Sequence, residues 1–282
     1  MSIDVSQNGR LSIGGHQIAY THLGNGPKIA LIHGIPTSRH LWRKIIPALV
    51  SAGREVIALD LLGYGESDKP LVADLGIQGQ SDIVVQALLA LGWARGTLVG
   101  HDIGGGIVQL IAVDHPEIIE RLILVDSIVY DSFPEPGIAR LKDPVWDGIL
   151  EAPDFDLKKG LAKGFARGMV HPDKITSELI EAYERPFRGV EGRRAYLRVA
   201  RGLRTEDLSS RMDAVERLEA PTLVIWGDND VFQPKALGER LARTVANGQF
   251  EVIEQAGHFL PEDAPEALAE LITKFTTPGK GA

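Results

Sequence analysis

A short glycine-rich segment near the middle of the chain holds the residue with the clearest chemical potential. The segment reads Gly100-His101-Asp102-Ile103-Gly104-Gly105 and follows the apolar run TLV. A nucleophile held at a sharp strand-to-helix turn needs small residues two positions before and two positions after it, because the strained turn leaves no room for side chains there. The pattern therefore predicts that Asp102 projects above a sheet at the start of a helix, where the helix dipole favours a carboxylate.

Two other roles are open for the same segment. Aspartate is a favoured N-cap residue, so Asp102 could simply begin a helix. A glycine-rich turn between a strand and a helix can also bind a dinucleotide phosphate, but the G-x-G-x-x-G spacing is absent and a carboxylate would repel the phosphate. Residues elsewhere in the chain must decide between a nucleophile and a cap.

The partners that a nucleophile needs follow it along the chain. His258 lies in AGHFLPE after the last predicted strand, and loops at the carboxyl end of a parallel sheet gather around one site. An acid that orients the imidazole is available as Asp230 in GDND after PTLVIWG, or alternatively as Asp126 at the end of RLILVD. Both choices keep the order nucleophile, acid, histidine. We expect Asp230 to fill this role, with Asp228 as a nearby structural acid.

A second loop completes the expected site. His33-Gly34-Ile35-Pro36 follows the apolar run KIALI, in the position of the loop that donates a backbone N–H group to an oxyanion hole. We expect the N–H groups of Ile35 and Ile103 to form that hole. Pro36 is expected to turn the loop inward, and His33 to line the substrate site.

The elements that must position these residues alternate between strands and helices. Helices are predicted within residues 41–53, 78–91 and 104–115. Strands are predicted at Gly15–Leu23, Lys28–His33, Glu55–Asp60, Thr97–His101, Arg121–Asp126, Pro221–Gly227 and Gln249–Glu254. This alternation is typical of βαβ units, so the sequence predicts an α/β protein with a mostly parallel central sheet flanked by helices.

The regular spacing breaks between the strands that end at Asp126 and begin at Pro221. No buried strand run occurs there, and helical patches such as Ile175–Glu184 and Arg193–Leu203 fill part of the gap. We interpret residues 131–215 as a helical cap over a core formed by residues 1–130 and 216–282. The alternative is a second, independent domain.

Composition narrows the class of ligand. The chain has 282 residues, a net charge of −8, 44% hydrophobic residues and no cysteine. An acidic chain is a poor match for nucleic acid or an anionic membrane, so we expect a small-molecule substrate. Without cysteine, and with no His pair at i, i+4, we expect neither a metal nor another cofactor. The start of the sequence lacks a basic and then apolar segment, so we expect no signal peptide and a cytoplasmic location. The oligomeric state stays open.

On these residues the chain resembles the α/β-hydrolase fold family, in the branch that uses an aspartate nucleophile. The segments HGIPTSRHLWR, DLLGYGESDKP, GHDIGGG, WGDNDVF and AGHFLPEDAPE follow one another across the whole chain. The first two are similar to haloalkane dehalogenases, and GHDxGG is shared with epoxide hydrolases and fluoroacetate-type dehalogenases. The resemblance implies a hydrolase that forms an alkyl ester on Asp102, which a water activated by His258 then hydrolyses.

The chain departs from each of these relatives beside the nucleophile. Haloalkane dehalogenases generally place a halide-binding Trp there, and often a donor after HG, whereas this chain has Ile103 and Ile35. Fluoroacetate-type enzymes place an Arg after the nucleophile and take their acid from the position of Asp126. The loss of a side-chain donor at residue 103 weakens the case for halide release.

The expected cap supplies candidates for handling the leaving group. Epoxide hydrolases usually protonate the epoxide oxygen with two cap tyrosines, and the candidates here are Tyr183 and Tyr196. Trp146 could instead donate its indole N–H to a halide. We therefore expect epoxide hydrolysis to a diol, with halide release from a haloalkane or haloacid as the alternative. A non-catalytic, ligand-binding member of the fold is a third hypothesis.

Overall fold

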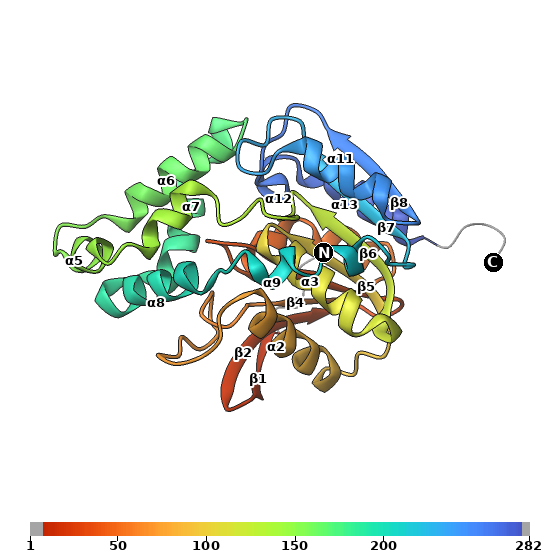
Figure 1. Ribbon diagram of the computed structural model, residues 1–282, viewed down its shortest axis with the longest axis horizontal. Helices are drawn as coiled ribbons and strands as arrows, with labels where there is room; N and C mark the ends of the chain where they lie inside the picture. The colour runs from red at the N-terminus through yellow and green to blue at the C-terminus, as the bar shows by residue number, and fades with distance from the viewer. Residues whose placement is uncertain (1–7, 278–282) are drawn as a thin grey trace.

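One central sheet of eight strands organises the computed structural model, which describes residues 8–277 (Figure 1). The strands lie in the order β1-β2-β4-β3-β5-β6-β7-β8. Pairs β1–β2 and β2–β4 are antiparallel, and every other pair is parallel. The strands are β1 Asn8–Ile13, β2 His16–Leu23, β3 Lys28–Ile32, β4 Glu55–Leu59, β5 Gly96–His101, β6 Ile119–Val125, β7 Thr222–Gly227 and β8 Gly248–Ile253. The mostly parallel α/β sheet predicted from the sequence is thereby confirmed.

The central strands are buried because helices cover the sheet. Strands β3, β5 and β7 are almost entirely buried, as expected when both faces of a parallel sheet are covered. The covering helices pack directly on strands or on one another. They are α1 Ile46–Ser51, α2 Ile77–Ala90, α3 Ile103–Asp114, α11 Lys235–Thr244 and α13 Pro265–Thr276, with the short α12 Leu260–Asp263 and the 3-10 turn η3 Pro116–Ile118.

Two elements differ from the sequence prediction. Strand β1 was not predicted, although it forms a hairpin with β2 across Gly14 and Gly15, which both have positive φ angles. Residues 41–53 do not form one helix. They contain the 3-10 helix η2 Arg39–Lys44 and then α1, because Pro47 has no amide hydrogen and cannot continue a helix from the preceding turn.

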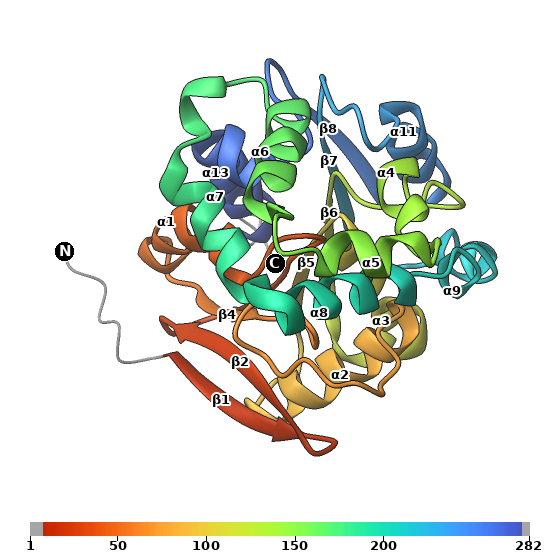
Figure 2. The ribbon, with the colours of Figure 1, turned by 90° about the vertical axis from the view of Figure 1, so that its left-hand side faces the viewer.

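The stretch between β6 and β7 is helical. Its helices are α4 Pro136–Ala139, α5 Val145–Glu151, α6 Leu157–Gly168, α7 Ser177–Glu184, α8 Gly189–Gly202, α9 Glu206–Ser209 and α10 Met212–Val215, with 3-10 turns η4 Arg140–Lys142, η5 Pro172–Lys174 and η6 Arg185–Phe187. Helices α5 to α8 form a layer at one end of the molecule, away from β7 and β8 (Figure 1). Figure 2 looks onto this layer, with the sheet behind it.

Among the helices of residues 8–277, none combines the length and the apolar character that crossing a membrane requires.

Candidate active site

Asp102 is the single residue between the end of β5 at His101 and the start of α3 at Ile103. Its backbone has φ 52° and ψ −121°, a strained conformation for a residue with a side chain. A Cβ atom at Gly100 would collide with the carbonyl of Gly104, and one at Gly104 would collide with the carbonyl of Ile32. The Asp102 side chain makes no capping hydrogen bond to α3, so the carboxylate does not act as a helix cap.

The Asp102 carboxylate is buried and accepts a hydrogen bond from the backbone. Its Oδ2 atom accepts a hydrogen bond of 2.9 Å from the N–H group of Ile35. Burial raises the pKa of Asp102 to about 6, against the opposing effects of the His258 charge and of the nearby backbone N–H groups of Ile35 and Ile103. Of the two N–H groups expected to form an oxyanion hole, that of Ile35 donates to this carboxylate.

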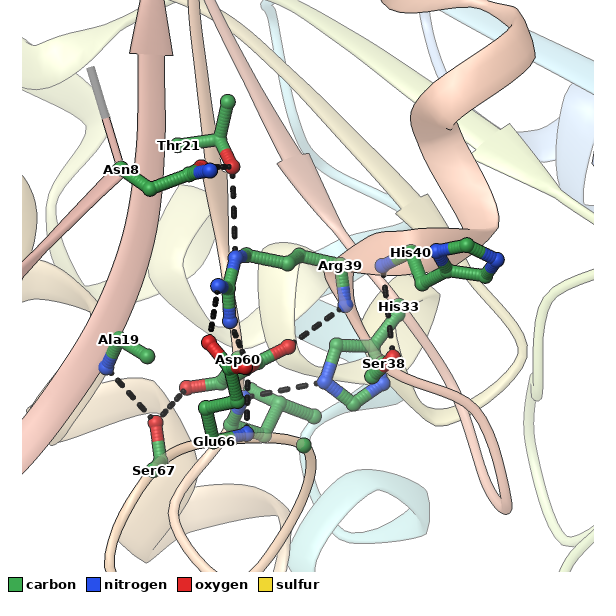
Figure 3. Close-up of polar contacts among 12 residues, drawn as sticks. Asn8, Ala19, Thr21, His33, Ser38, Arg39, His40, Asp60, Glu66 and Ser67 are labelled. Atoms are coloured by element: carbon green, nitrogen blue, oxygen red, sulfur yellow. Dashed lines mark hydrogen bonds and ion pairs between the residues drawn. The ribbon is translucent and has the colours of Figure 1, made fainter. Parts of the chain in front are cut away.

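The loop that carries Ile35 is held by hydrogen bonds to the segment after β4 (Figure 3). His33 donates from Nδ1 to the carbonyl of Gly34 at 2.9 Å and accepts at Nε2 from the N–H group of Leu61 at 3.0 Å. Asp60 accepts from the backbone N–H group of Arg39 at 2.7 Å and also pairs with its guanidinium group. These contacts fix the position of the Ile35 N–H group, and the Ile35–Pro36 peptide bond is cis.

His33 therefore has a different place from the one expected. Its side chain is fully buried, both ring nitrogens are used within the loop network, and it is not part of the cavity wall around Asp102. Burial lowers the pKa of His33 to about 4, so the ring is neutral near pH 7. Contrary to expectation, His33 supports the loop and does not line the cavity.

His258 faces Asp230 across the end of the sheet. Its Nδ1 atom lies 2.9 Å from Oδ2 of Asp230, whose other oxygen accepts from the N–H groups of Phe232 (2.7 Å) and Gln233 (3.0 Å). Burial acts to raise the pKa of Asp230, but the His258 charge and these hydrogen bonds outweigh it, and the pKa is lowered. For His258, burial acts to lower the pKa, but the charges of Asp230 and Asp102 outweigh it, and the pKa is raised.

The other candidate acid, Asp126, follows β6 and bonds to the end of β7. Its Oδ1 atom accepts from the N–H group of Gly227 at 2.8 Å, and its Oδ2 atom has no hydrogen-bond partner within residues 8–277. Burial and the charge of Asp230 raise the pKa of Asp126 well above its usual range. In this structure Asp230 contacts His258. Asp228 is exposed and accepts from the N–H group of Ala256 at 3.3 Å.

One buried residue beside the site, His101, was not predicted from the sequence. The Nε2 atom of His101 lies 2.8 Å from the backbone carbonyl of His258. Burial lowers the pKa of His101 to about 3, so the neutral ring donates its Nε2 hydrogen to that carbonyl. His101 therefore holds the loop of His258 against the end of β5. Its position directly before Asp102 is the only signal that the sequence offered.

Asp102 and His258 open into one cavity of about 970 Å³, within the range of small-molecule sites. Its wall is largely apolar and includes Ile35, Ile103, Ile128, Phe133, Leu203 and Phe259. Tyr196 and Trp146, from the helices between β6 and β7, also line it. Burial is the main cause that raises the pKa of Tyr196 to about 12, so its hydroxyl stays protonated. No cluster of three or more potential metal ligands occurs within residues 8–277.

Tyr183 does not belong to this cavity, contrary to expectation. Its ring is buried and its hydroxyl donates to Oε1 of Glu262 at 2.7 Å. Glu262 is completely buried and also pairs with Arg43. A buried carboxylate needs several donors, so the Tyr183 hydroxyl is committed to Glu262. Only one of the two expected tyrosines therefore reaches the site.

Comparisons with known proteins agree with this architecture. A family model described as alpha/beta hydrolase fold matches residues 27–152. A 2-hydroxymuconate semialdehyde hydrolase from a Pseudomonas species is 33% identical, over 89% of this chain and 87% of its own. A soluble epoxide hydrolase from a Corynebacterium species is 29% identical over 99% of both chains. The crystal structure of an alpha/beta hydrolase fold protein from Burkholderia ambifaria superposes with a TM-score of 0.85 at 26% identity, covering 96% of this chain and 97% of its own.

Proposed function

The chain belongs to the α/β-hydrolase fold family, and from that premise we propose that it is an epoxide hydrolase that works through an ester on Asp102. One observation carries the proposal: a carboxylate, not a hydroxyl, stands at the strained turn with one oxygen bound by the Ile35 N–H group. Attack of a carboxylate on an acyl group would give a reactive anhydride. Attack on a saturated carbon gives a stable alkyl ester that water can hydrolyse.

In the first step, ionised Asp102 attacks a carbon of the epoxide ring through its free oxygen. The bond between that carbon and the epoxide oxygen breaks, and the oxygen takes the proton of the Tyr196 hydroxyl. Oδ2 of Asp102 becomes the carbonyl oxygen of the ester and keeps its hydrogen bond to Ile35. Tyr196 is suited to this role because it lines the cavity and remains protonated near neutral pH.

In the second step, His258 activates water against the ester. Formation of the ester removes the negative charge of Asp102, which is one of the charges that raise the pKa of His258. The pKa of His258 therefore falls when the ester forms, so more of the imidazole is in the neutral form that can take a proton from water, while Asp230 holds its other nitrogen. Hydroxide adds to the carbonyl carbon, and the N–H groups of Ile35 and Ile103 stabilise the oxyanion on Oδ2. Collapse breaks the bond between the carbonyl carbon and the alkyl oxygen, and the released alkoxide takes the proton of the Asp102 carboxyl group to give the diol. The proton held by His258 then restores Tyr196.

The helices between β6 and β7 have a defined place in this proposal. We assign residues 131–215 to a cap, and residues 1–130 and 216–282 to the core that bears Asp102, His258 and Asp230. The cap supplies Tyr196 and Trp146 to the cavity wall. Substrate choice then depends on the cap, while the chemistry of ester formation and hydrolysis belongs to the core.

Halide release is the second candidate, and Trp146 is the observation that favours it. An indole N–H group in the cavity wall can stabilise a departing halide. The side chains of Ile35 and Ile103 cannot add a second donor beside Asp102. We rank epoxide opening ahead because Tyr196 offers a proton, which an epoxide oxygen needs and a halide does not.

The covalent mechanism is tested by trapping the ester. The variant His258→Gln, incubated with a panel of epoxides and 1-haloalkanes, is expected to gain the mass of one opened epoxide or one alkyl group, mapped to the peptide that contains Asp102. The variant Asp102→Asn serves as the control and should gain nothing. Diol and halide release by the unchanged enzyme then separate the two candidates. If no compound of either class yields an adduct or turnover, the proposed mechanism is wrong.

A further inference from the structure

Helix α6 carries a short repeat along the cavity wall. Its sequence LKKGLAKGFARG places a cation before a glycine three times, as Lys159-Gly160, Lys163-Gly164 and Arg167-Gly168. Residues four apart lie on the same face of a helix, so the cations form one row and the glycines form a second row beside it. Lys159, Gly160, Lys163, Gly164 and Arg167 all line the cavity that contains Asp102. Figure 2 shows α6 in the layer that faces the viewer, in front of the sheet.

The inner end of the cation row is already partnered. Arg167 lies 3.8 Å from Glu135, and its guanidinium carbon is 4.7 Å from the ring centre of Phe232. The ring of Phe232 is in turn 5.2 Å from that of His258. Arg167 therefore marks the end of α6 that approaches the reacting groups, and Glu135 compensates much of its charge.

The outer end of the row is free to bind an anion. Lys159 and Lys163 are exposed, and within residues 8–277 neither has an acidic group at ion-pair distance. Two acidic residues share this part of the wall. Asp156 caps α6 by accepting from the N–H group of Lys159 at 2.9 Å, and Asp154 is exposed. Lys163 lies roughly 6 Å and Lys159 roughly 12 Å along the helix from Arg167.

The charged residues at the two ends of the cavity determine which way round an amphiphilic ligand would bind. The carboxylates of Asp102 and Glu135 repel an anion at the inner end, where the wall near Asp102 is mostly apolar. The unpaired lysines attract an anion at the outer end. A substrate that places its electrophilic carbon at Asp102 and its anionic group at the α6 lysines must be long enough to reach from one to the other.

The glycine row leaves space for the body of such a substrate. A Cβ atom added at Gly160 or Gly164 would meet no other atom within 4 Å. Alanine would therefore fit at both positions and is a better helix former than glycine. The free protein gives no packing reason for glycine at these positions, whereas close approach of a ligand to the helix backbone would give one.

A buried amide adds a further polar contact. Gln233 is 3% exposed and lines the same cavity, and its amide oxygen has no hydrogen-bond partner within residues 8–277. A buried acceptor without a partner is unfavourable. A ligand that carries a hydroxyl or another donor would satisfy it, so the cavity suits a functionalised chain better than a plain hydrocarbon.

We propose that α6 selects an elongated substrate with a carboxylate at one end and the reactive carbon at the other, and that Lys159 and Lys163 bind the carboxylate. This inference rests on the proposed function for the identity of the reactive carbon, but the binding of the anionic end can be measured without turnover. In the mechanism above, Lys159 and Lys163 set the affinity and orientation of the substrate and take no part in bond breaking.

The test compares decanoate with decanamide, which differ in charge but not in chain length. Isothermal titration of the full-length protein is expected to show decanoate binding about tenfold more tightly at low salt, as two partly exposed ion pairs would give. The preference should shrink at high salt because the lysines are exposed. The double variant Lys159→Gln/Lys163→Gln should bind both compounds with nearly equal affinity. Lys158→Gln is the matched control, since Lys158 lies on the same helix but outside the cavity wall.

The outcomes separate this inference from the proposed function. Equal affinities for the two compounds, an unchanged preference in the double variant, or no binding of either compound would overturn the role of α6, whatever the trapping experiment shows. Loss of the ester adduct with a retained preference for decanoate would instead overturn the chemistry alone. A second variant tests the glycine row: Gly164→Ala should raise the melting temperature and weaken the binding of both compounds. Unchanged affinity in that variant would show that the ligand does not contact the helix backbone there.

Discussion

Replacing Asp102 by asparagine should make the folded protein more stable at neutral pH while abolishing its activity. Burial raises the pKa of Asp102 from an ordinary value of 3.8 to about 6. An acid whose pKa is higher in the folded state than in the unfolded state destabilises the fold once it ionises. That cost is absent below about pH 4, grows between pH 4 and 6, and is complete above about pH 6. The difference between a pKa of 3.8 and a pKa of about 6 corresponds to about 3 kcal/mol.

Asparagine keeps the shape of the side chain and an oxygen that can accept from the Ile35 N–H group, but it carries no charge. Urea unfolding should therefore show that Asp102→Asn exceeds the parent in free energy of unfolding by up to about 3 kcal/mol at pH 8, and by almost nothing at pH 4. In a thermal scan the gain at pH 8 corresponds to roughly 6 °C or more. Asp131→Asn, at an exposed position, is the control and should change stability by less than about 0.5 kcal/mol. An Asp102→Asn variant that is no more stable than the parent at pH 8 would refute the view that the site holds this carboxylate at an energetic cost.

Three further predictions concern catalysis. The rate of ester formation in rapid-quench experiments should fall about tenfold for each pH unit below about 6, since only ionised Asp102 attacks; a flat profile down to pH 4 would contradict this. Tyr196→Phe should slow ester formation from epoxides by about 10²-fold or more while affecting haloalkanes much less, and equal losses would remove Tyr196 from the role of acid. Asp230→Asn should slow ester hydrolysis by orders of magnitude so that the adduct accumulates. Asp126→Asn should leave hydrolysis nearly unchanged because Asp230, not Asp126, contacts His258, and a reversed order of these two effects would identify Asp126 as the acid.

The parts of the fold that the sequence predicted well are those whose signal is local. The buried strands β3 to β7 are mostly apolar runs, and the observed ends of strands β3 to β8 lie within a residue or two of the predicted ones. The turn around Asp102 could be recognised because the glycines that it requires, Gly100 and Gly104, stand at fixed positions two residues before and two residues after Asp102. Strand β1 was missed because it alternates exposed with half-buried residues at the edge of the sheet and has no apolar run.

The errors concern where side chains point. Tyr183 and Tyr196 both lie on helices between β6 and β7, and nothing local distinguishes them. Tyr183 stacks on Phe165, with ring centres 5.1 Å apart, and bonds to Glu262, a residue from the far end of the chain. These contacts depend on how α7 packs against distant segments, and helical periodicity in the sequence does not predict that packing.

The choice between the two acids shows the same limit. Asp126 and Asp230 follow neighbouring parallel strands, β6 and β7, so both satisfy the order of residues along the chain. The contact with His258 depends on which acid reaches Nδ1 of the ring, a matter of a few ångströms. The contact of His101 with the His258 carbonyl was invisible for the same reason, because it joins residues from two distant segments.

The most direct test of the central claim is a single turnover in water enriched in ¹⁸O, with enzyme in excess over an epoxide that the protein converts. If water attacks the carbonyl carbon of an ester on Asp102, the first turnover should give an unlabelled diol, and the peptide that contains Asp102 should carry one heavy oxygen atom. A labelled diol with an unlabelled peptide would mean that water attacks the substrate directly, and Asp102 would then not be a nucleophile.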